Sequence, residues 1–413
     1  MSSEWKSTTL GEICKSQGGA IQTGPFGSQL HTSDYKEFGV PVVMPTNIGD
    51  GGIVEDGIAR IDQADVERLS QHKLQLGDIV FSRRGDVTKN ALIRPHEVGW
   101  FCGTGCLKVR LGDESKATAK FISHCLRMPD IKDWLIRHAV GATMPNLNTG
   151  ILSAVPIHLP PLKTQLEIAS MLGALDDRIS LLRETNTTLE AIAQALFKSW
   201  FVDFDPVRAK QQGSDPQGMD AATAALFPDS FEESELGEVP KGWRIGTLQD
   251  LLVLQRGFDL PSQDRVPGDF PIIAASGPSG THFEPMAKGP GVITGRSGVL
   301  GRVFLELEDY WPLNTALWVK EFKAATPCYA YEILRLLDFA SFNAGSAVPT
   351  LNRNHIHTLR YTIPNFECVK AYEEIAIKLH QRVKANEKQA QTLATLRDTL
   401  LPRLISGQLR LPA

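Results

Sequence analysis

The sequence predicts an α+β protein in which two globular parts are each followed by one very long helix. Residues 160–200 and 364–404 both open with proline and then carry apolar side chains at alternating steps of four and three. This spacing is typical of a helix that packs lengthwise on another helix. The remaining chain contains short apolar runs typical of strands, followed later in each half by shorter helical stretches.

The two long helices correspond to each other residue by residue at an offset of 204 positions. A 40-residue helix is ~60 Å long, whereas an average helix has only ~11–12 residues. Two such matched helices pack most economically on each other, although each could instead pack on its own globular part. Asn186, Asn386 and Arg397 interrupt the stripes, either to fix register or because they face solvent where the helices diverge. The stripes consist of Ile168, Leu172, Leu175, Ile179, Leu182, Asn186, Leu189, Ala193, Leu196 and Trp200, and of Tyr372, Ala376, Leu379, Val383, Asn386, Ala390, Leu393, Arg397, Leu400 and Leu404.

The globular parts are also duplicates of each other. Residues 4–10 resemble residues 242–248 at an offset of 238, and residues 141–148 match residues 345–352 at an offset of 204. The first part is therefore longer by a loop-rich insertion. Strands are expected at 40–44, 77–81, 107–111, 271–275, 291–294 and 302–305, and helices at 120–135 and 329–338. The predicted division is 1–159 for the first domain, 160–205 for its helix, 206–240 for a linker, 241–363 for the second domain and 364–413 for the last helix.

Composition and charge exclude few functions. The formal net charge is −4, but residues 202–240 alone hold 9 acidic and 2 basic side chains, so the globular parts are close to neutral. Charge thus neither favours nor excludes nucleic acid. The six cysteines show no framework spacing, and the pair Cys102 and Cys106 lacks a nearby second pair for zinc. No apolar run could span a bilayer and residues 1–19 lack an apolar centre, so we expect a cytoplasmic protein without membrane contact.

Two cognate loops are the main candidates for DNA contact. Residues 295–301 follow a predicted strand and combine three glycines with Arg296, whose planar guanidinium suits phosphate or guanine. Residues 82–89 occupy the corresponding place in the first half. Residues 22–29 form a further polar, glycine-rich loop, with a short counterpart near residue 256. The alternative is that these are surface turns with solvated side chains. The candidate DNA-binding residues are Gln22, Thr23, Ser28, Arg83, Arg84, Lys89, Arg256, Arg296, Ser297 and Asn314.

Other segments have a structural rather than a chemical interpretation. Residues 145–148 and 349–352 are expected to join each domain to its helix rather than to touch nucleic acid. The chain lacks the glycine-lysine phosphate loop and the serine nucleophile elbow. Residues 203–206, Asp-Phe-Asp-Pro, only superficially resemble the Asp-Pro-Pro-Tyr box of DNA methyltransferases and are interpreted as a helix terminator. Two rival functions remain: a stand-alone DNA methyltransferase or nuclease, and a coiled-coil scaffold that binds proteins instead of DNA.

Several motifs in order resemble one known family, the specificity (S) subunits of type I restriction-modification enzymes. The resemblance covers nearly the whole chain and is carried most clearly by residues 196–207 (LFKSWFVDFDPV), 225–230 (ALFPDS) with 236–243 (LGEVPKGW), and 396–407 (LRDTLLPRLISG). Within the globular parts, residues 24–30, 77–80, 289–292 and 295–298 are similar to target-recognition segments of that family.

The resemblance implies a non-catalytic DNA-recognition subunit. It implies two target recognition domains, each reading one half of a bipartite, asymmetric site in double-stranded DNA, with the long helices packed as an antiparallel coiled coil that spaces them. It also implies two modification (methyltransferase) subunits docked on the helices and, through them, two restriction/translocase subunits. No cofactor is expected in this chain, whereas S-adenosylmethionine, ATP and Mg are expected in the partner subunits.

Overall fold

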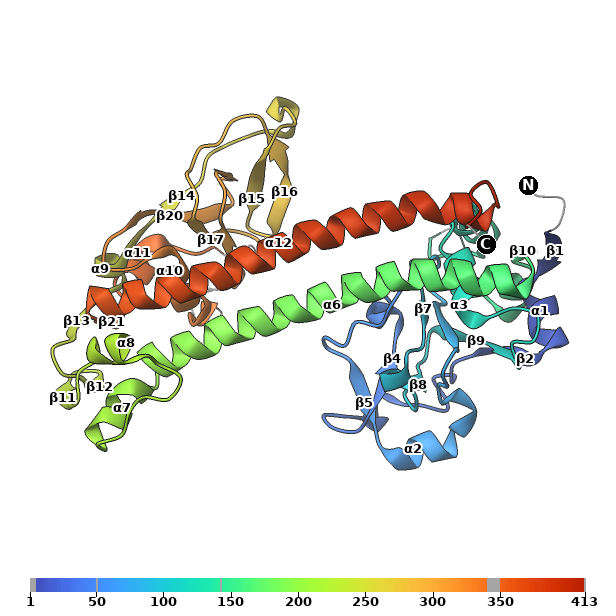
Figure 1. Cartoon of the computed structure of the whole chain (residues 1–413), viewed down its shortest axis with the longest axis horizontal. Helices are drawn as coiled ribbons and strands as arrows, with labels where there is room; N and C mark the ends of the chain where they lie inside the picture. The colour runs from blue at the N-terminus through green and yellow to red at the C-terminus, as the bar shows by residue number, and fades with distance from the viewer. Residues whose placement is uncertain (1–4, 50, 142, 340–349, 412–413) are drawn as a thin grey trace. The chain divides into compact units, whose positions relative to one another are not determined.

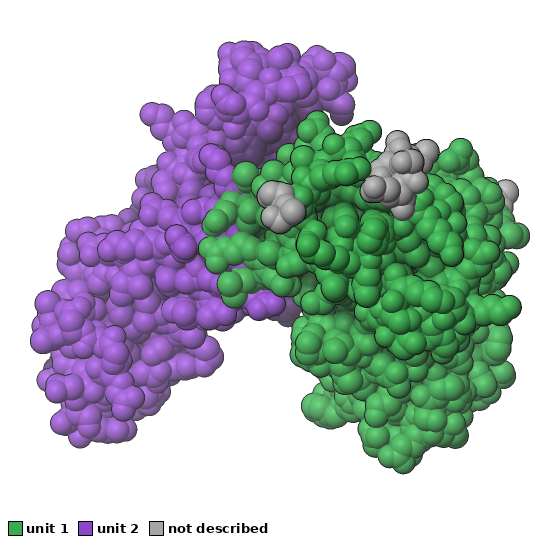
Figure 2. All heavy atoms as spheres, turned by 45° about the vertical axis from the view of Figure 1, so that its right-hand side comes forward, with its two compact units in different colours: residues 1–181, 389–413 green, residues 182–388 purple. Residues whose placement is uncertain are grey.

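The computed structural model describes residues 5–49, 51–141, 143–339 and 350–411. The chain divides into two compact units, and Figure 2 distinguishes them by colour. Unit 1 consists of residues 1–181 and 389–413, and unit 2 consists of residues 182–388. Each unit therefore contains one globular part together with a portion of both long helices, α6 (Leu162–Phe201) and α12 (Phe366–Ile405) (Figure 1).

Unit 1 is built on two four-stranded sheets. The first is antiparallel and has the order β2-β9-β6-β7, with bounds Gly18–Thr23, Cys106–Gly112, Ile79–Ser82 and Asn90–Leu92. The second has the order β3-β5-β4-β8, with bounds Tyr35–Lys36, Ala59–Ile61, Val40–Val43 and Phe101–Cys102, and its β4 and β8 are parallel. A separate antiparallel pair joins β1 (Lys6–Thr9) to β10 (Pro156–Leu159).

Helices cover the first sheet and complete the core of unit 1. α1 begins at a capping box in which Thr9 and Glu12 satisfy each other's backbone N–H groups. The helix expected at 120–135 is in fact two helices, because the chain leaves α3 at Arg127 and Pro129 starts α4 at a position that needs no N–H partner. The helices of unit 1 are α1 (Leu10–Ser16), α2 (Gln63–Arg68), α3 (Ala119–Leu126), α4 (Pro129–His138) and α5 (Thr149–Ser153), with 3₁₀ turns η1 (Thr32–Asp34), η2 (Pro45–Asn47), η3 (Ser70–His72) and η4 (Pro95–Glu97).

Unit 2 repeats the topology of unit 1. Its antiparallel sheet has the order β14-β20-β17-β18, with bounds Leu252–Arg256, Ala316–Phe322, Gly291–Gly295 and Val303–Glu306. A second sheet, β16-β15-β19, has bounds Gly277–His282, Phe270–Ala274 and Trp311–Pro312, and β15 and β19 are parallel, as β4 and β8 are. The described residues of 241–363 also form the helices α9 (Leu248–Leu251), α10 (Pro327–Arg335) and α11 (Arg353–His357) and the 3₁₀ turn η5 (Ser262–Asp264).

Strand register shows that the duplication is structural. β13 (Arg244–Thr247) pairs with β21 (Arg360–Ile363), as β1 pairs with β10 in unit 1. Lys6 lies opposite Leu159 and Arg244 lies opposite Ile363, so the partners differ by the same offsets, 238 and 204, that relate the two sequences. The internal repeat read from the sequence is therefore confirmed, and each of the six predicted strands corresponds to an observed strand.

Residues 206–240, expected to link the two halves, form ordered elements in unit 2. They contain α7 (Asp205–Gln211), α8 (Ala221–Ala225) and a hairpin of β11 (Phe231–Ser234) and β12 (Gly237–Pro240). Val207 and Phe227 are buried in the core of unit 2 together with Trp200 and Trp243. The helix terminator predicted at 203–206 is observed, since α6 ends at Phe201 and Phe204 adopts a left-handed conformation with φ of 56°.

The two long helices pack on each other through buried polar contacts. In unit 2 the Asn386 amide donates to Asn186 Oδ1 at 2.8 Å, and the Asn186 amide donates to the Val383 carbonyl at 3.2 Å. The Tyr372 hydroxyl donates to the Ala193 carbonyl at 3.2 Å. Partner numbers fall along α6 as they rise along α12, so the helices are antiparallel. The predicted antiparallel coiled coil is confirmed, and Asn186 and Asn386 pair with each other instead of facing solvent.

Arg397, the third interruption of the stripes, pairs across the helices in unit 1. Its guanidinium donates to Asp176 Oδ1 at 2.7 Å, and Arg127 on the α3–α4 connection donates to Asp176 Oδ2 at the same distance. Burial acts to raise the pKa of the Asp176 carboxyl, but the hydrogen bonds and charges of the two arginines outweigh it and hold that pKa below its usual value. Neighbouring His124 is neutral because burial lowers its pKa to about 4.

Replacing Asn386 by leucine tests the buried amide pair. The Asn386→Leu variant leaves Asn186 Oδ1 buried without its donor, so we expect a loss of ~1–3 kcal/mol in the free energy of unfolding, measured by urea denaturation. The double variant Asn186→Leu/Asn386→Leu removes both polar groups and should lose less than the single variant. Exposed Glu374→Ala on α12 serves as the control. A double variant that loses as much stability as Asn386→Leu alone, or more, would contradict this account.

Candidate nucleic-acid interface

Three loops of unit 2 meet at one end of its antiparallel sheet. Arg256 ends β14, Arg296 directly follows β17, and Asn314 lies two residues before β20. Because β20 runs antiparallel between β14 and β17, its start lies beside the ends of both neighbours. The backbone N–H groups of Arg296 and Ser297 both donate to the Thr315 carbonyl, at 2.8 and 3.1 Å. Four candidate residues predicted from the sequence are thus brought to one edge.

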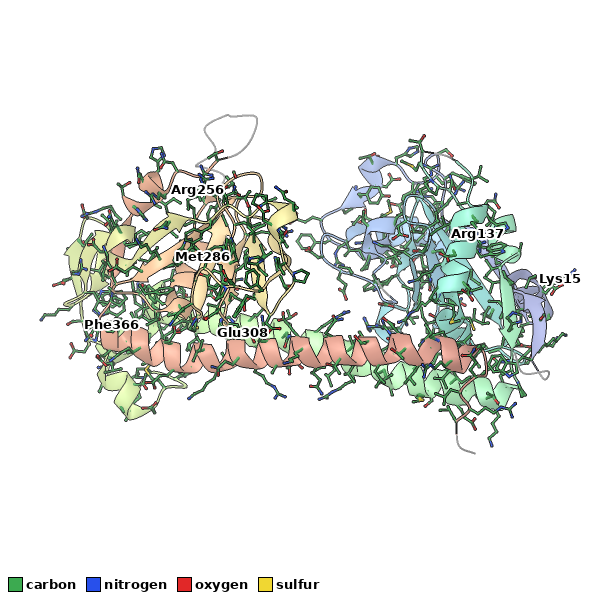
Figure 3. All side chains as sticks on the ribbon, turned by 90° about the horizontal axis from the view of Figure 1, so that it is seen from above. Lys15, Arg137, Arg256, Met286, Glu308 and Phe366 are labelled. Atoms are coloured by element: carbon green, nitrogen blue, oxygen red, sulfur yellow. The ribbon has the colours of Figure 1, made fainter. Side chains whose placement is uncertain are left out.

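Side-chain hydrogen bonds connect these loops through a residue that the sequence analysis missed. Asp259 Oδ1 accepts from the Asn314 amide and from the Arg256 guanidinium, the latter at 3.4 Å. Arg296 donates to the Asn314 backbone carbonyl at 3.3 Å. The side chains of Arg256 and Asp259 are 51% and 68% exposed, so they are accessible to a ligand. Figure 3 shows Arg256 on a side of unit 2 remote from α12. In the sequence, Asp259 is distinguished only by its position three residues after the candidate Arg256.

Unit 1 builds the same edge with different side chains. Gln22 and Thr23 end β2, and Arg83 and Arg84 directly follow β6. The Gly24 N–H donates to the Cys106 carbonyl and the Arg83 N–H donates to the Gly105 carbonyl, as Gly257 and Arg296 do to Ala316 and Thr315 in unit 2. These bonds make the following positions equivalent: Gly24 and Gly257, Arg83 and Arg296, Arg84 and Ser297, Thr104 and Asn314.

The loop after β2 is a tight turn that presents Phe26. Gln29 Oε1 accepts from the Phe26 N–H at 3.0 Å, and the Gln29 N–H donates back to the Phe26 carbonyl at 2.8 Å. Phe26 is 58% exposed, whereas Leu30 is buried beneath the turn. Candidate Ser28 lies on this turn. A side chain at Gly24 would approach the Gly103 carbonyl to 2.1 Å, so only glycine fits where the turn leaves the sheet.

The segments expected to join domain and helix lie against the arginine loops. The Leu147 N–H donates to the Arg83 carbonyl at 2.9 Å, and the Arg83 guanidinium donates to Asn146 Oδ1 at 3.3 Å. In unit 2 the Leu351 N–H donates to the Arg296 carbonyl at 2.8 Å. Residues 345–349 of the second motif lie outside the described residues. The described residues of these two segments therefore hydrogen-bond to the arginine loops, and the chain then continues toward the long helices.

Lys89 lies at the other end of the loop that starts at Arg83. Its backbone carbonyl accepts from the Ser82 N–H at 3.0 Å and closes the loop that starts at Arg83. Lys89 also lines a polar pocket together with Lys132. The candidates of unit 1 thus fall into two places: the edge formed by Gln22, Thr23, Arg83 and Arg84, and the pocket at Lys89.

Other chemistries find little support in the described parts of the chain. No group of three or more His, Cys, Asp or Glu side chains there could hold a metal ion. The six cysteines are buried, and burial raises the pKa of Cys102 to about 12. Among the described helices, none has both the length and the apolar character to cross a membrane.

Comparison with known proteins gives a consistent picture. Residues 2–191 match the family of the type I restriction modification DNA specificity domain. The HindI specificity subunit of Haemophilus influenzae is 25% identical over 339 residues, which cover 67% of this chain and 73% of that protein. The MjaIX specificity subunit of Methanocaldococcus jannaschii is 24% identical over 316 residues, covering 71% and 69%.

The fold agrees with the sequence comparison. The crystal structure of a type I restriction-modification S subunit from M. genitalium superposes with a TM-score of 0.60 and 16% identity, and covers 97% of this chain and 96% of that one. The resemblance noted in the sequence motifs is confirmed, because the matched family and the named relatives are type I specificity domains and subunits. In sequence this chain is thus similar to the specificity subunits of type I restriction-modification enzymes, and its fold is similar to that of one such subunit.

Proposed function

We propose that this chain selects the DNA sequence for a type I restriction-modification enzyme, with each globular part reading one half of a bipartite target. The observation that carries the proposal is the repeated sheet edge, which holds an arginine loop at the same place in both units. Arginine pairs bidentately with guanine, and asparagine amides pair with adenine, in the major groove. The ten residues predicted from the sequence are the proposed contacts, with Asp259 added to them.

The two half-sites should differ because equivalent positions carry different chemistry. Arg84 of unit 1 corresponds to Ser297 of unit 2, and Thr104 corresponds to Asn314. In unit 2, Asp259 is hydrogen-bonded to Arg256 and Asn314. Unit 1 has Thr23 and Thr104 at the positions of Arg256 and Asn314. Different donors and acceptors on the same backbone frame favour different bases, so the target is proposed to be asymmetric.

The long helices are proposed to space the two domains and to dock partner subunits. Exposed leucines lie along them, including Leu166, Leu181 and Leu396, at 53%, 50% and 46% exposure. Such side chains suit the packing of partner helices. The domain boundaries proposed are those predicted from the sequence, with residues 206–240 assigned to the second domain. Two modification subunits and two restriction subunits would supply S-adenosylmethionine, ATP and Mg, and the catalysis.

Mapping methylated adenines tests the proposal directly. The chain is co-expressed with its modification subunit, and genomic methylation is read by sequencing. We expect methylation within one bipartite, asymmetric motif. The purified chain alone, incubated with S-adenosylmethionine or Mg²⁺, should neither methylate nor cut DNA. Activity of the lone chain would favour a stand-alone enzyme, and absence of any DNA footprint with the modification subunit present would favour a protein scaffold.

Variants at the edge of unit 2 test the assignment of contacts. Arg296→Ala should cost ~1–3 kcal/mol in discrimination at one half-site because a bidentate base contact is lost. Asp259→Ala should relax the same half-site, since Asn314 and Arg256 lose their common acceptor. Methylation mapping provides the measurement, and Glu233→Ala on β11 is the control. Equal relaxation at both half-sites, or unchanged motifs, would refute the assignment.

A further inference from the structure

A polar pocket of about 220 Å³ lies inside unit 1, beside the arginine loop. Its lining includes Asp86, Thr88 and Lys89 from the connection between β6 and β7, Asn90 at the start of β7, and Arg127 and Lys132 from the region of α3 and α4. A volume of this size accommodates one phosphate group with several waters, given ~30 Å³ for each water. Only Lys89 of these residues was a candidate from the sequence.

Positive charge dominates the described lining of this pocket. Lys89, Lys132 and Arg127 face one carboxylate, Asp86. Asp86 Oδ1 already accepts from the Thr88 N–H at 3.1 Å and from the Thr88 hydroxyl at 2.7 Å, so that oxygen is used within its own loop. Within the described residues, neither lysine ammonium group has an ion pair or hydrogen bond. Two unpaired ammonium groups beside a buried guanidinium are suited to an anion.

One residue that lines the pocket, Asn90, is buried and has an amide oxygen without a partner among the described residues. Asn90 is 2% exposed, and its amide nitrogen donates to the Thr88 carbonyl at 3.3 Å. Its oxygen Oδ1 has no partner among the described residues. Buried polar atoms are nearly always hydrogen-bonded, so this acceptor requires a donor.

Gly51 and Arg127, which both line the pocket, lie in close contact with each other. Gly51 has a φ of 79°, and a side chain there would come within 2.9 Å of the Arg127 guanidinium. Arg127 is in turn fixed by Asp176, to which it donates at 2.7 Å. Asp176, which does not line the pocket, therefore holds the Arg127 guanidinium in position. The ammonium groups of Lys89 and Lys132 remain available to a ligand.

We propose that this pocket holds one backbone phosphate of the DNA, immediately beside the bases that unit 1 reads. The inference rests on the proposed function, because Lys89 ends the loop that begins with Arg83 and Arg84. A duplex that places its bases against that loop continues toward the pocket. The contact would position the DNA without reading sequence, since phosphates carry no base information. Inorganic phosphate shares the same chemistry, and the experiment separates these two sources.

The test measures the salt dependence of DNA binding by the complex of this chain with its modification subunit. Lys132→Ala should weaken binding to target and to unrelated duplexes by the same factor. It should also lower the slope of log K against log salt concentration by about 1, because one fewer counterion is released. Lys89→Ala should behave in the same way, and Lys132→Arg should restore the wild-type slope. Lys120→Ala, which removes an exposed lysine from α3 of the same unit, is the matched control.

Two results would overturn the proposal. The first is a Lys132→Ala slope equal to those of wild type and Lys120→Ala. The second combines two measurements: inorganic phosphate raises the Tm of wild type but not of Lys132→Ala, and the salt slopes of DNA binding are equal for both proteins. That result would make the pocket a site for free anions. Sequence-specific binding and methylation that persist in either case leave the proposed function intact. Failure of the wild-type complex to bind its mapped target would instead refute the proposed function.

Discussion

The polar side chains buried between α6 and α12 impose the constraint on which the rest of the structure depends. Asn186 and Asn386 are hydrogen-bonded inside unit 2, and Asp176 and Arg397 are paired inside unit 1. A shift of either helix by one heptad would separate these partners and leave amides or charges buried without hydrogen bonds, at a cost of several kcal/mol. Apolar stripes alone tolerate such shifts far better. The polar contacts therefore select one register, and each globular part inherits a defined attachment to the helix pair.

Backbone hydrogen bonds explain how two domains of one fold can carry different specificities. The turn after β2 is fixed to β9 by the bond from Gly24 to Cys106, and the matching bond in unit 2 runs from Gly257 to Ala316. Neither bond involves a side chain. The side chains at this edge are consequently free to vary while the loops stay in place. Backbone hydrogen bonds thus fix the loops, while the exposed side chains determine what the edge can bind. Such an arrangement is suited to a recognition protein, whose target can change with a few exposed residues.

Much of this architecture was predictable because it repeats in the sequence. The seven-residue period identified both long helices, and the offsets of 238 and 204 identified the two duplicated globular parts. The linker prediction for 206–240 rested on the many Asp, Gly, Pro and Ser residues of this segment, and it overlooked the buried apolar side chains of Val207 and Phe227. The split between α3 and α4 was missed because the helical pattern is otherwise continuous across it. Pro129, the first residue of α4, is the one sign of the break. Asp259 and the lining of the pocket bring together positions far apart in sequence, and no local period reports such contacts.

The place of α12 in unit 1 has a consequence for protein synthesis. Leu401, Leu404 and Ile405 are buried in the same core as Leu10, Phe81 and Phe121 near the beginning of the chain. Each such side chain contributes ~1.5–3 kcal/mol when it leaves water. A ribosome adding ~5–20 residues per second needs roughly 10–50 s to proceed from residue 181 to these residues. During that interval the nascent first domain exposes an unfinished apolar surface, which makes it a natural client for chaperones.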